Sequence, residues 1–191
     1  MAYRTCKALS GLTMLMASAS ALALVGTPVA FAQEAAVAAA TVAADHASPD
    51  AVVAALYEVI SGPAGKARDW PRLRALFAPQ AKMIAVGNRP DGSMPAAVMT
   101  LDDYIARVTK PFNDAGFYES ELARTSERFG PIVHVFSTYE SRRAPADVKP
   151  FQRGINSIQL IFDGARWSIA SLVWRAETET QPLPDKYLKT R

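Results

Sequence analysis

The sequence has 191 residues, 50% of them hydrophobic, and its 21 basic and 18 acidic residues leave a formal net charge of +3. The basic residues form no cluster, which excludes a nucleic-acid partner because phosphate binding requires a concentrated basic surface. Cys6 is the only cysteine, and a single cysteine excludes a disulfide framework.

The first 32 residues have the pattern of a secretory signal peptide. Arg4 and Lys7 precede an apolar run over residues 9–25, and Ala30-Phe31-Ala32 supplies a small-residue cleavage site. The run is interrupted by polar residues and is shorter than the ~20 apolar residues of a membrane span. We therefore expect cleavage after Ala32, export to the periplasm, and no membrane span afterwards. Removal of the two basic residues leaves a nearly neutral chain of 159 residues.

The remaining chain divides into three parts. Residues 33–47 are rich in Ala and Val and predict a flexible leader, because small side chains bury too little surface to hold it. Residues 48–177 predict one domain, and residues 178–191 form a polar tail. No internal repeat is present.

Three helices are predicted in the first half of the domain. Ser48 is a favourable N-cap for a helix over residues 49–60, and Asp69 caps a second helix over residues 70–78. A short strand over 82–87 and a turn-rich loop over 88–95 follow. Thr100 caps a third helix, with Asp102 and Asp103 in its first turn, and Pro111 is expected to disrupt its last turn.

Four long strands are predicted after residue 116, over about 117–128, 132–140, 153–162 and 166–174. The last two flank Asp163-Gly164, a strong hairpin signal. Helices followed by a run of antiparallel strands predict an α+β fold in the order α-α-β-α-β-β-β-β. The antiparallel sheet is expected to carry the helices on one face.

Side-chain alternation predicts which residues of these strands face inward. In the strand before the Asp163-Gly164 turn, the more apolar set contains Asn156, Ile158, Leu160 and Phe162. A loop with an even number of residues places Trp167, Ile169, Ser171 and Val173 on the same face, whereas a three-residue loop would reverse the return strand. Symmetric pairing places Val133, Val135, Ser137 and Tyr139 inward. The inward face therefore turns polar at one end, which indicates either a pocket or an internal polar network.

The chain resembles the nuclear transport factor 2-like superfamily over about residues 48–177. The resemblance rests on Phe162-Asp163-Gly164, Trp167, Ile169, Trp174 and the strand over 136–140. It looks most similar to secreted bacterial members related to polyketide-cyclase-like (SnoaL-like) domains. The resemblance implies a cone with a pocket at its wide end and a homodimer formed through the convex sheet face, where Ile155, Ile161, Ala170, Leu172 and Trp174 are expected. Family members include isomerases, dehydratases, cyclases and non-catalytic binders, so the fold does not select an activity.

Candidate pocket residues combine the inward polar side chains with aromatic residues of the helices. They are Tyr57, Trp70, Tyr104, Ser137, Tyr139, Asn156 and Ser171. The catalytic candidates among the strands are Tyr139, Asn156 and His134, although His134 falls on the outward set. No metal site or cofactor is predicted, because no metal-ligand spacing or phosphate-loop pattern occurs.

The inward sets contain no carboxylate, which a ketosteroid-isomerase-like reaction would need as its base. Glu119 and Glu121 are interpreted as solvated strand charges, and Glu140 is expected to pair with Arg153, which could otherwise meet a ligand carboxylate. The preferred hypothesis is therefore a domain that binds a small apolar or carbonyl-containing molecule without catalysis. The alternatives are an isomerase, dehydratase or cyclase that uses a small carbonyl substrate, and a dimeric protein-interaction module.

Overall fold

A computed structural model describes residues 28–87, 89 and 91–189 of the chain. The predicted signal segment lies largely outside these residues, and its last five residues begin helix α1 (Pro28–Asp45). Side chains 33–41 of α1 are exposed, but the end of the helix is held to the domain. There Asp45 forms an ion pair with Arg72, and the His46 ring nitrogen Nδ1 lies 2.6 Å from the Trp167 carbonyl oxygen. Within the described ranges, no helix has the length and apolar character that a membrane span requires.

The helices of the domain are α2 (Pro49–Ile60), α3 (Trp70–Ala75) and α4 (Leu101–Ala115). The predicted caps are confirmed, because Ser48 accepts from the Ala51 amide and Thr100 forms a reciprocal capping box with Asp103. Pro111 does not break α4. The helix continues past it and packs the Phe112 ring on Phe117, with centroids 4.0 Å apart.

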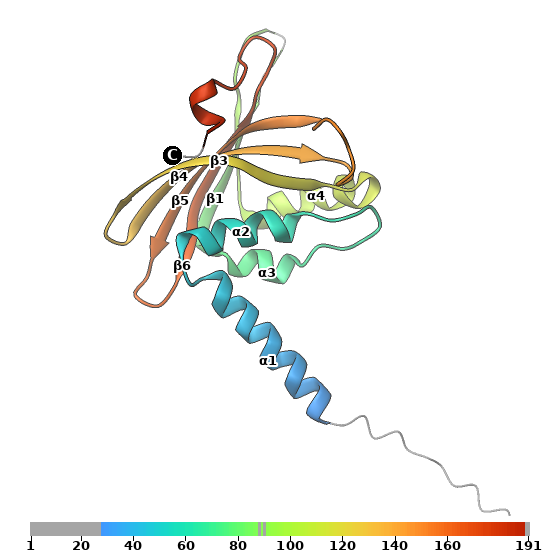
Figure 1. Cartoon of the computed structure of the whole chain (residues 1–191), viewed down its shortest axis with the longest axis vertical. Coiled ribbons are helices and arrows are strands. Elements are labelled where there is room, and N and C mark those ends of the chain that lie inside the picture. Colours follow the sequence, from blue (N-terminus) through green and yellow to red (C-terminus); the bar gives the residue numbers. More distant parts are fainter. Residues whose placement is uncertain (1–27, 88, 90, 190–191) are drawn as a thin grey trace, which may run out of the picture.

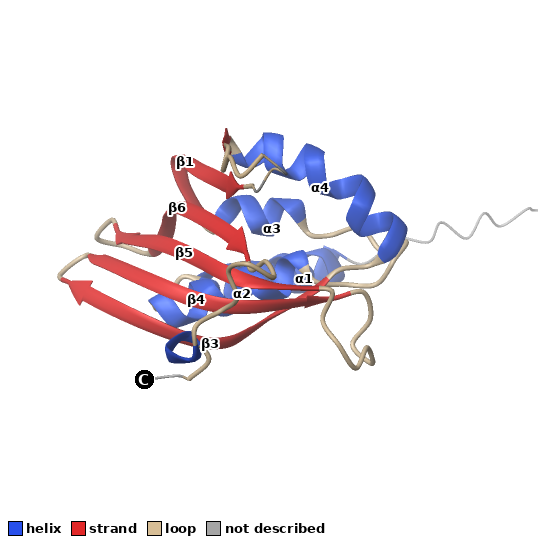
Figure 2. Cartoon of the chain, turned by 90° about the horizontal axis from the view of Figure 1, so that it is seen from above, coloured by secondary structure: helices blue, strands red, loops and turns tan. Residues whose placement is uncertain are grey.

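Six strands form one curved sheet in the order β2-β1-β6-β5-β4-β3 (Figure 1). They are β1 (Phe77–Val86), β2 (Ala96–Met99), β3 (Tyr118–Phe129), β4 (Ile132–Arg142), β5 (Gln152–Phe162) and β6 (Trp167–Ala176). Helices α2, α3 and α4 lie on one face of this sheet (Figure 2). The short 3-10 helix η1 (Asp185–Tyr187) lies on the other face, where the Tyr187 ring contacts Phe136. The predicted α+β class is confirmed.

The sheet is mixed, whereas a purely antiparallel sheet was expected. Strand β1 runs parallel to β6 and pairs Met83 with Leu172. Residues 77 and 78, predicted as the end of the second helix, belong to β1 because Phe77 pairs with Ile169 on β6. Strand β2 was not predicted, since its short run has no alternation and depends on pairing with β1.

Two β-bulges decide which side chains of the sheet face the helices. In β3 the register shifts between Glu121 and Ala123, so Leu122 is the extra residue. In β6 the register shifts opposite Gln159 and Leu160, so Ala170 is the extra residue. Each bulge reverses the alternation for the rest of its strand. Strands β4 and β5 pair without a shift, and their predicted inward residues are buried, except Phe162 at the end of β5, which is 38% exposed.

Candidate functional site

A cavity of about 250 Å³ lies between the helices and the concave face of the sheet. Most of its wall is apolar and comes from α2, α4, β1 and β6. These side chains include Leu56, Ile60, Met83, Phe112, Leu172 and Trp174. Most polar side chains of the wall come from β3, β4 and β5, which form the polar side of the cavity. Tyr104 and Arg107 are polar residues on the otherwise apolar side formed by α4.

Glu119 on β3 supplies a carboxyl group to the polar side of the cavity. The Ser141 hydroxyl donates to its Oε2 atom at 2.9 Å, and the Asn156 amide donates to its Oε1 atom at 3.2 Å. Burial raises the pKa of Glu119 to about 7, although both hydrogen bonds favour the charged form. A carboxyl group with this pKa can both accept and donate a proton near neutral pH.

The backbone around Glu119 is fastened to the end of α2. The Glu119 amide donates to Ser61 Oγ at 3.0 Å, and Ser61 Oγ donates to the Tyr57 carbonyl oxygen at 2.7 Å. Gly62 and Phe117 exchange two backbone hydrogen bonds beside this contact. We call these contacts between residues 57–62 and 117–119 the Ser61 clasp. They fix the carboxylate-bearing residue against a rigid helix end.

Two tyrosine side chains also line the cavity, one from β4 and one from α4. Tyr139 on β4 accepts from the Gln152 amide at 2.9 Å, which leaves its own proton available to a ligand. Tyr104 on α4 makes no hydrogen bond to another described residue, and its ring packs edge-on against Trp174. Burial raises the pKa of both hydroxyls, and the charge of Glu119 raises it further, so both remain neutral donors.

The backbone of β5 makes room for Tyr139. A Cβ atom added to Gly154 would lie 2.2 Å from the Arg175 carbonyl oxygen and 2.7 Å from the Tyr139 hydroxyl. Only glycine fits at this position. Arg107 of α4 also lines the cavity and is exposed to solvent, so a cationic group is available to a ligand.

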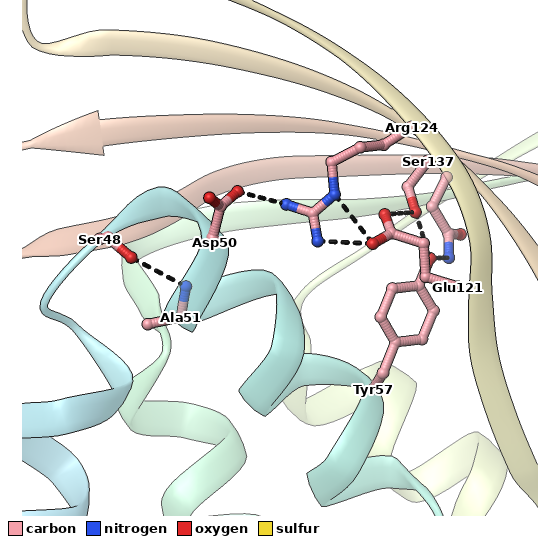
Figure 3. A network of polar contacts seen from close by, with 8 residues as sticks. Ser48, Asp50, Ala51, Tyr57, Glu121, Arg124 and Ser137 are labelled. Atoms are coloured by element: carbon pink, nitrogen blue, oxygen red, sulfur yellow. Dashed lines mark hydrogen bonds and ion pairs between the residues drawn. The ribbon is translucent and has the colours of Figure 1, made fainter. Parts of the chain in front are cut away.

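Three of the predicted pocket residues, Tyr104, Tyr139 and Asn156, line the cavity. Two more lie directly behind its polar wall, where the Tyr57 hydroxyl and Ser137 Oγ are 2.7 Å apart (Figure 3). The predicted inward face of β4 and β5 therefore brings Ser137 and Asn156 into hydrogen-bond contact with Tyr57 of α2.

The other predicted residues lie elsewhere. Trp70 packs against the core and is not part of the cavity wall. Ser171 pairs with Gln159 on the outer face, because the bulge at Ala170 turns Leu172 and Trp174 inward in its place. Leu172 and Trp174 had been expected on the convex face. His134 also lies on the outer face, where its Nε2 atom is 3.1 Å from Ser157 Oγ.

The interpretation of Glu119 and Glu121 as solvated charges is wrong. The bulge at Leu122 pairs Glu119 with Ser141 and Glu121 with Tyr139, and thus puts both carboxylates on the inward face. Uninterrupted pairing from the Gly130 turn would have turned Glu119 outward. The expected pair between Arg153 and Glu140 is also absent, since Arg153 binds Glu177 and Glu140 binds Arg142.

No group of three or more His, Cys, Asp or Glu side chains that could hold a metal ion occurs in the described part of the chain. The expected absence of a metal and a cofactor remains a prediction. The chemistry that the wall itself offers is proton transfer by one carboxyl group and hydrogen-bond donation by two neutral tyrosines.

Comparisons of the sequence find no matching family model and no matching curated protein. Solved structures do match. One is the β subunit of a provisionally assigned aromatic-ring-hydroxylating dioxygenase from Novosphingobium aromaticivorans, with a TM-score of 0.51, 14% identity, and coverage of 73% of this chain and 92% of that one. Another is a nuclear transport factor 2-like protein of unknown function from Pseudomonas putida, with a TM-score of 0.50, 12% identity, and coverage of 69% and 87%.

A third match is a protein of unknown function with a cystatin-like fold from Nostoc punctiforme. Its TM-score is 0.50 and its identity 11%, and the match covers 69% of this chain and 90% of that one. At these identities the likeness concerns the fold and not the activity. Together with the cone of helices on a curved sheet, it shows that the chain has the nuclear transport factor 2-like fold.

Proposed function

We propose that the chain is a proton-transfer enzyme of the isomerase or dehydratase type, acting on a small carbonyl-containing molecule held in the cavity. The observation that carries this proposal is the carboxyl group of Glu119 in the cavity wall, with a pKa of about 7. The preference for a non-catalytic binder rested on the lack of an inward carboxylate, and that premise does not hold.

The proposed step needs only groups that the wall contains. The Glu119 carboxylate accepts a proton from the carbon next to the substrate carbonyl, and the C–H electron pair shifts to the carbonyl oxygen. Hydroxyl protons of Tyr139 and Tyr104 stabilise the enolate oxygen. In an isomerisation the protonated Glu119 then returns the proton to another carbon of the substrate. In a dehydration the enolate expels the hydroxyl group of the β carbon, which takes the proton from Glu119 and leaves as water. In both cases the enzyme ends as it began.

Size and charge limit the substrate. A cavity of about 250 Å³ is at the small end of ligand sites, whose volumes are roughly 300–1,000 Å³. Its apolar side suits a hydrocarbon body, and Arg107 at the solvent side suits a polar or anionic end. A compact, mostly apolar carbonyl compound meets these conditions.

Deuterium exchange tests the proposal without knowledge of the natural substrate. A panel of small ketones, enones and oxo acids is incubated with the protein in D₂O, and deuterium uptake next to the carbonyl is followed by NMR. We expect uptake for at least one compound and a loss of about 10²–10⁴-fold in Glu119→Gln, because a general base contributes that much.

Glu127→Gln is the matched control, since Glu127 is an exposed carboxylate on the same strand. It should exchange at the wild-type rate. Equal rates in wild type and Glu119→Gln, with both proteins folded, would contradict the assignment of Glu119. The absence of exchange across the panel, together with tight binding of one of its members, would return the preference to a non-catalytic ligand-binding domain.

We also propose export and dimerisation, both of which rest on the sequence pattern. Mass spectrometry of a periplasmic fraction should find a chain whose mass matches a first residue of Gln33. For the dimer, support comes from the outer face of the sheet, where Ile155 is half-buried and Ile161 is 37% exposed. Sedimentation should give a dimer that Ile161→Asp dissociates, and a wild-type monomer would exclude it.

A further inference from the structure

A chain of hydrogen bonds runs from the cavity carboxyl to a second carboxylate behind the wall. The Asn156 amide nitrogen lies 3.1 Å from the Tyr57 hydroxyl, which lies 2.7 Å from Ser137 Oγ, and Ser137 Oγ lies 2.5 Å from Glu121 Oε1 (Figure 3). We call the sequence Glu121, Ser137, Tyr57 and Asn156 the buried chain. Its members come from β3, β4, α2 and β5, so four elements meet in it.

Glu121, at one end of the buried chain, acts only as a hydrogen-bond acceptor. Arg124 donates to Glu121 Oε2 through Nε at 2.8 Å and through Nη2 at 2.5 Å, and it also binds Asp50 at 2.6 Å. A carboxylate paired with a guanidinium group is ionised and only accepts hydrogen bonds. The bulge at Leu122 makes this pair possible, because it brings Glu121 and Arg124 to the same face of β3.

The acceptor at this end determines the direction of every other bond. Ser137 must donate its one proton to Glu121, so it accepts from Tyr57. Tyr57 therefore donates to Ser137 and must accept from Asn156. Asn156 can only donate through its NH₂ group, and the same nitrogen lies 3.2 Å from Glu119 Oε1.

We propose that the buried chain is a positioning device, which holds the Asn156 amide with its N–H donors toward Glu119 and so stabilises the carboxylate form of that group. The proposal rests on the proposed function, because it concerns the base of that reaction. With the opposite amide orientation, the Asn156 carbonyl oxygen would face Glu119 and favour its protonated form. Residues that never touch the substrate thereby set the fraction of Glu119 that is ready to accept a proton.

Other charged or titratable groups also surround Glu119. By element they are Tyr57 on α2, Tyr104 and Arg107 on α4, Glu121 and Arg124 on β3, and Tyr139 and Arg142 on β4. A test must leave their charges unchanged. Replacing Glu121 would remove a negative charge and lower the pKa of Glu119 for that reason alone, whereas Ser137→Ala interrupts the buried chain without a change in charge.

The experiment is a ¹³C NMR titration of the glutamate carboxyl carbons, with the Glu119 signal assigned from its loss in Glu119→Gln. In Ser137→Ala, Tyr57 loses its acceptor and is free to donate to the Asn156 carbonyl oxygen, which turns the amide over. We expect the pKa of Glu119 to rise by about one pH unit, the size of one lost hydrogen bond to a charged group. The side-chain amide signals of Asn156 should shift in the same variant.

Ser157→Ala is the matched control, because Ser157 lies on β5 with its hydroxyl toward His134 on the outer face. It should leave the pKa of Glu119 unchanged. Tyr57→Phe is the second test and should raise the pKa of Glu119 in the same direction if Ser137→Ala does not fold. An unchanged or lowered Glu119 pKa in a folded variant of the buried chain overturns the proposal. Because the titration needs no substrate, this outcome is independent of whether deuterium exchange is found.

Discussion

The central strands β4 and β5 differ from their neighbours β3 and β6 in one respect. The β4–β5 ladder keeps a single register from Ile132 and Ile161 to Ser141 and Gln152. Strands β3 and β6 each contain a one-residue shift. The regular pair provides Tyr139 and Asn156, which simple alternation predicts. The bulged strands provide Glu119 and Trp174, which simple alternation places on the wrong face.

This difference separates two contributions to the site. The regular strands determine where hydrogen-bond donors stand, and their positions follow from the period of two. The bulges determine which further side chains join them, and a bulge adds one residue without a change in the hydrophobic pattern. The Glu119 carboxyl group, on which the proposed reaction depends, faces the cavity because of the bulge.

Deletion of Ser120 should break the comparison most severely. Glu121 keeps its pairing with Tyr139, and the loss of one residue moves Glu119 opposite Glu140 on the outer face, away from Ser141 and Asn156. Deuterium exchange should disappear, and the pKa of Glu119 should fall from about 7 toward its ordinary value of 4.5. The ¹³C titration measures this directly. Ser120→Ala, which keeps the register, is the control, and a Glu119 pKa still near 7 after the deletion would show that the register of β3 does not place it.

Gly154→Ala tests the regular pair. Its new Cβ atom would meet the Arg175 carbonyl oxygen at 2.2 Å, so strands β5 and β6 must separate. We expect the free energy of unfolding to fall by about 3 kcal/mol, measured by urea denaturation. Gly87→Ala serves for comparison, since its nearest contacts are at 3.6 Å, and it should cost less than about 1 kcal/mol. Similar urea midpoints for Gly154→Ala and Gly87→Ala would contradict the close approach of Gly154 to the Arg175 carbonyl oxygen.

The pH dependence of stability tests the environment of Glu119. Its pKa is about 7 in the fold and 4.5 when unperturbed, so between these values the folded state binds a proton that the unfolded state has released. The stabilising contribution is full below about pH 4.5 and is lost as the pH rises through 7. The difference amounts to about 3 kcal/mol.

Urea unfolding across pH 4.5–8 measures this dependence. Glu119→Gln should remove the decline in stability over that window, and Glu127→Gln should keep it. Asp91, Asp103 and Asp163 have pKa values lowered by their hydrogen bonds, so they act at lower pH and with the opposite sign. Parallel curves for wild type and Glu119→Gln would contradict the raised pKa.

The smallest expected effects are changes in ligand affinity caused by variants of Trp174 and Ser171, two nearby residues of β6. Trp174→Ala enlarges the cavity and should weaken binding of any compound that exchanges, by about tenfold for the loss of one aromatic contact. Ser171→Ala lies on the outer face and should leave affinity unchanged. Isothermal titration distinguishes them, and a larger loss in Ser171→Ala would restore the alternation without a bulge.

Much of the fold follows from local signals in the sequence. Ser48 and Thr100 are caps whose hydrogen bonds depend only on their neighbours, and the four-residue loop after Phe162 is one of the even-numbered lengths that alternation required. Strand β1 could not be predicted at its start, because Leu73, Leu76 and Phe77 have helical spacing and only pairing with β6 overrides it.

Part of the candidate site could also be predicted from local signals in the sequence. Tyr139 and Asn156 follow from alternation within one hairpin, and Tyr104 follows from the apolar face of its helix. Glu119 depends on a shift between two strands that no residue near Leu122 signals, since charged and polar residues occur on both sides of it. A useful signal was that Ser137 and Asn156 were both predicted inward, because two inward hydrogen-bond donors require acceptors nearby.

The Ser61 clasp determines how slowly Glu119 can move away from the cavity wall. Since residues 61–62 after α2 and residues 117–119 at the start of β3 share four hydrogen bonds, Glu119 cannot leave the cavity wall while these elements stay folded. Fast loop motion therefore does not move the base, and only a cooperative opening of α2 away from the sheet can expose it. The amide of Glu119 should accordingly exchange with solvent as slowly as the amides of the central strands.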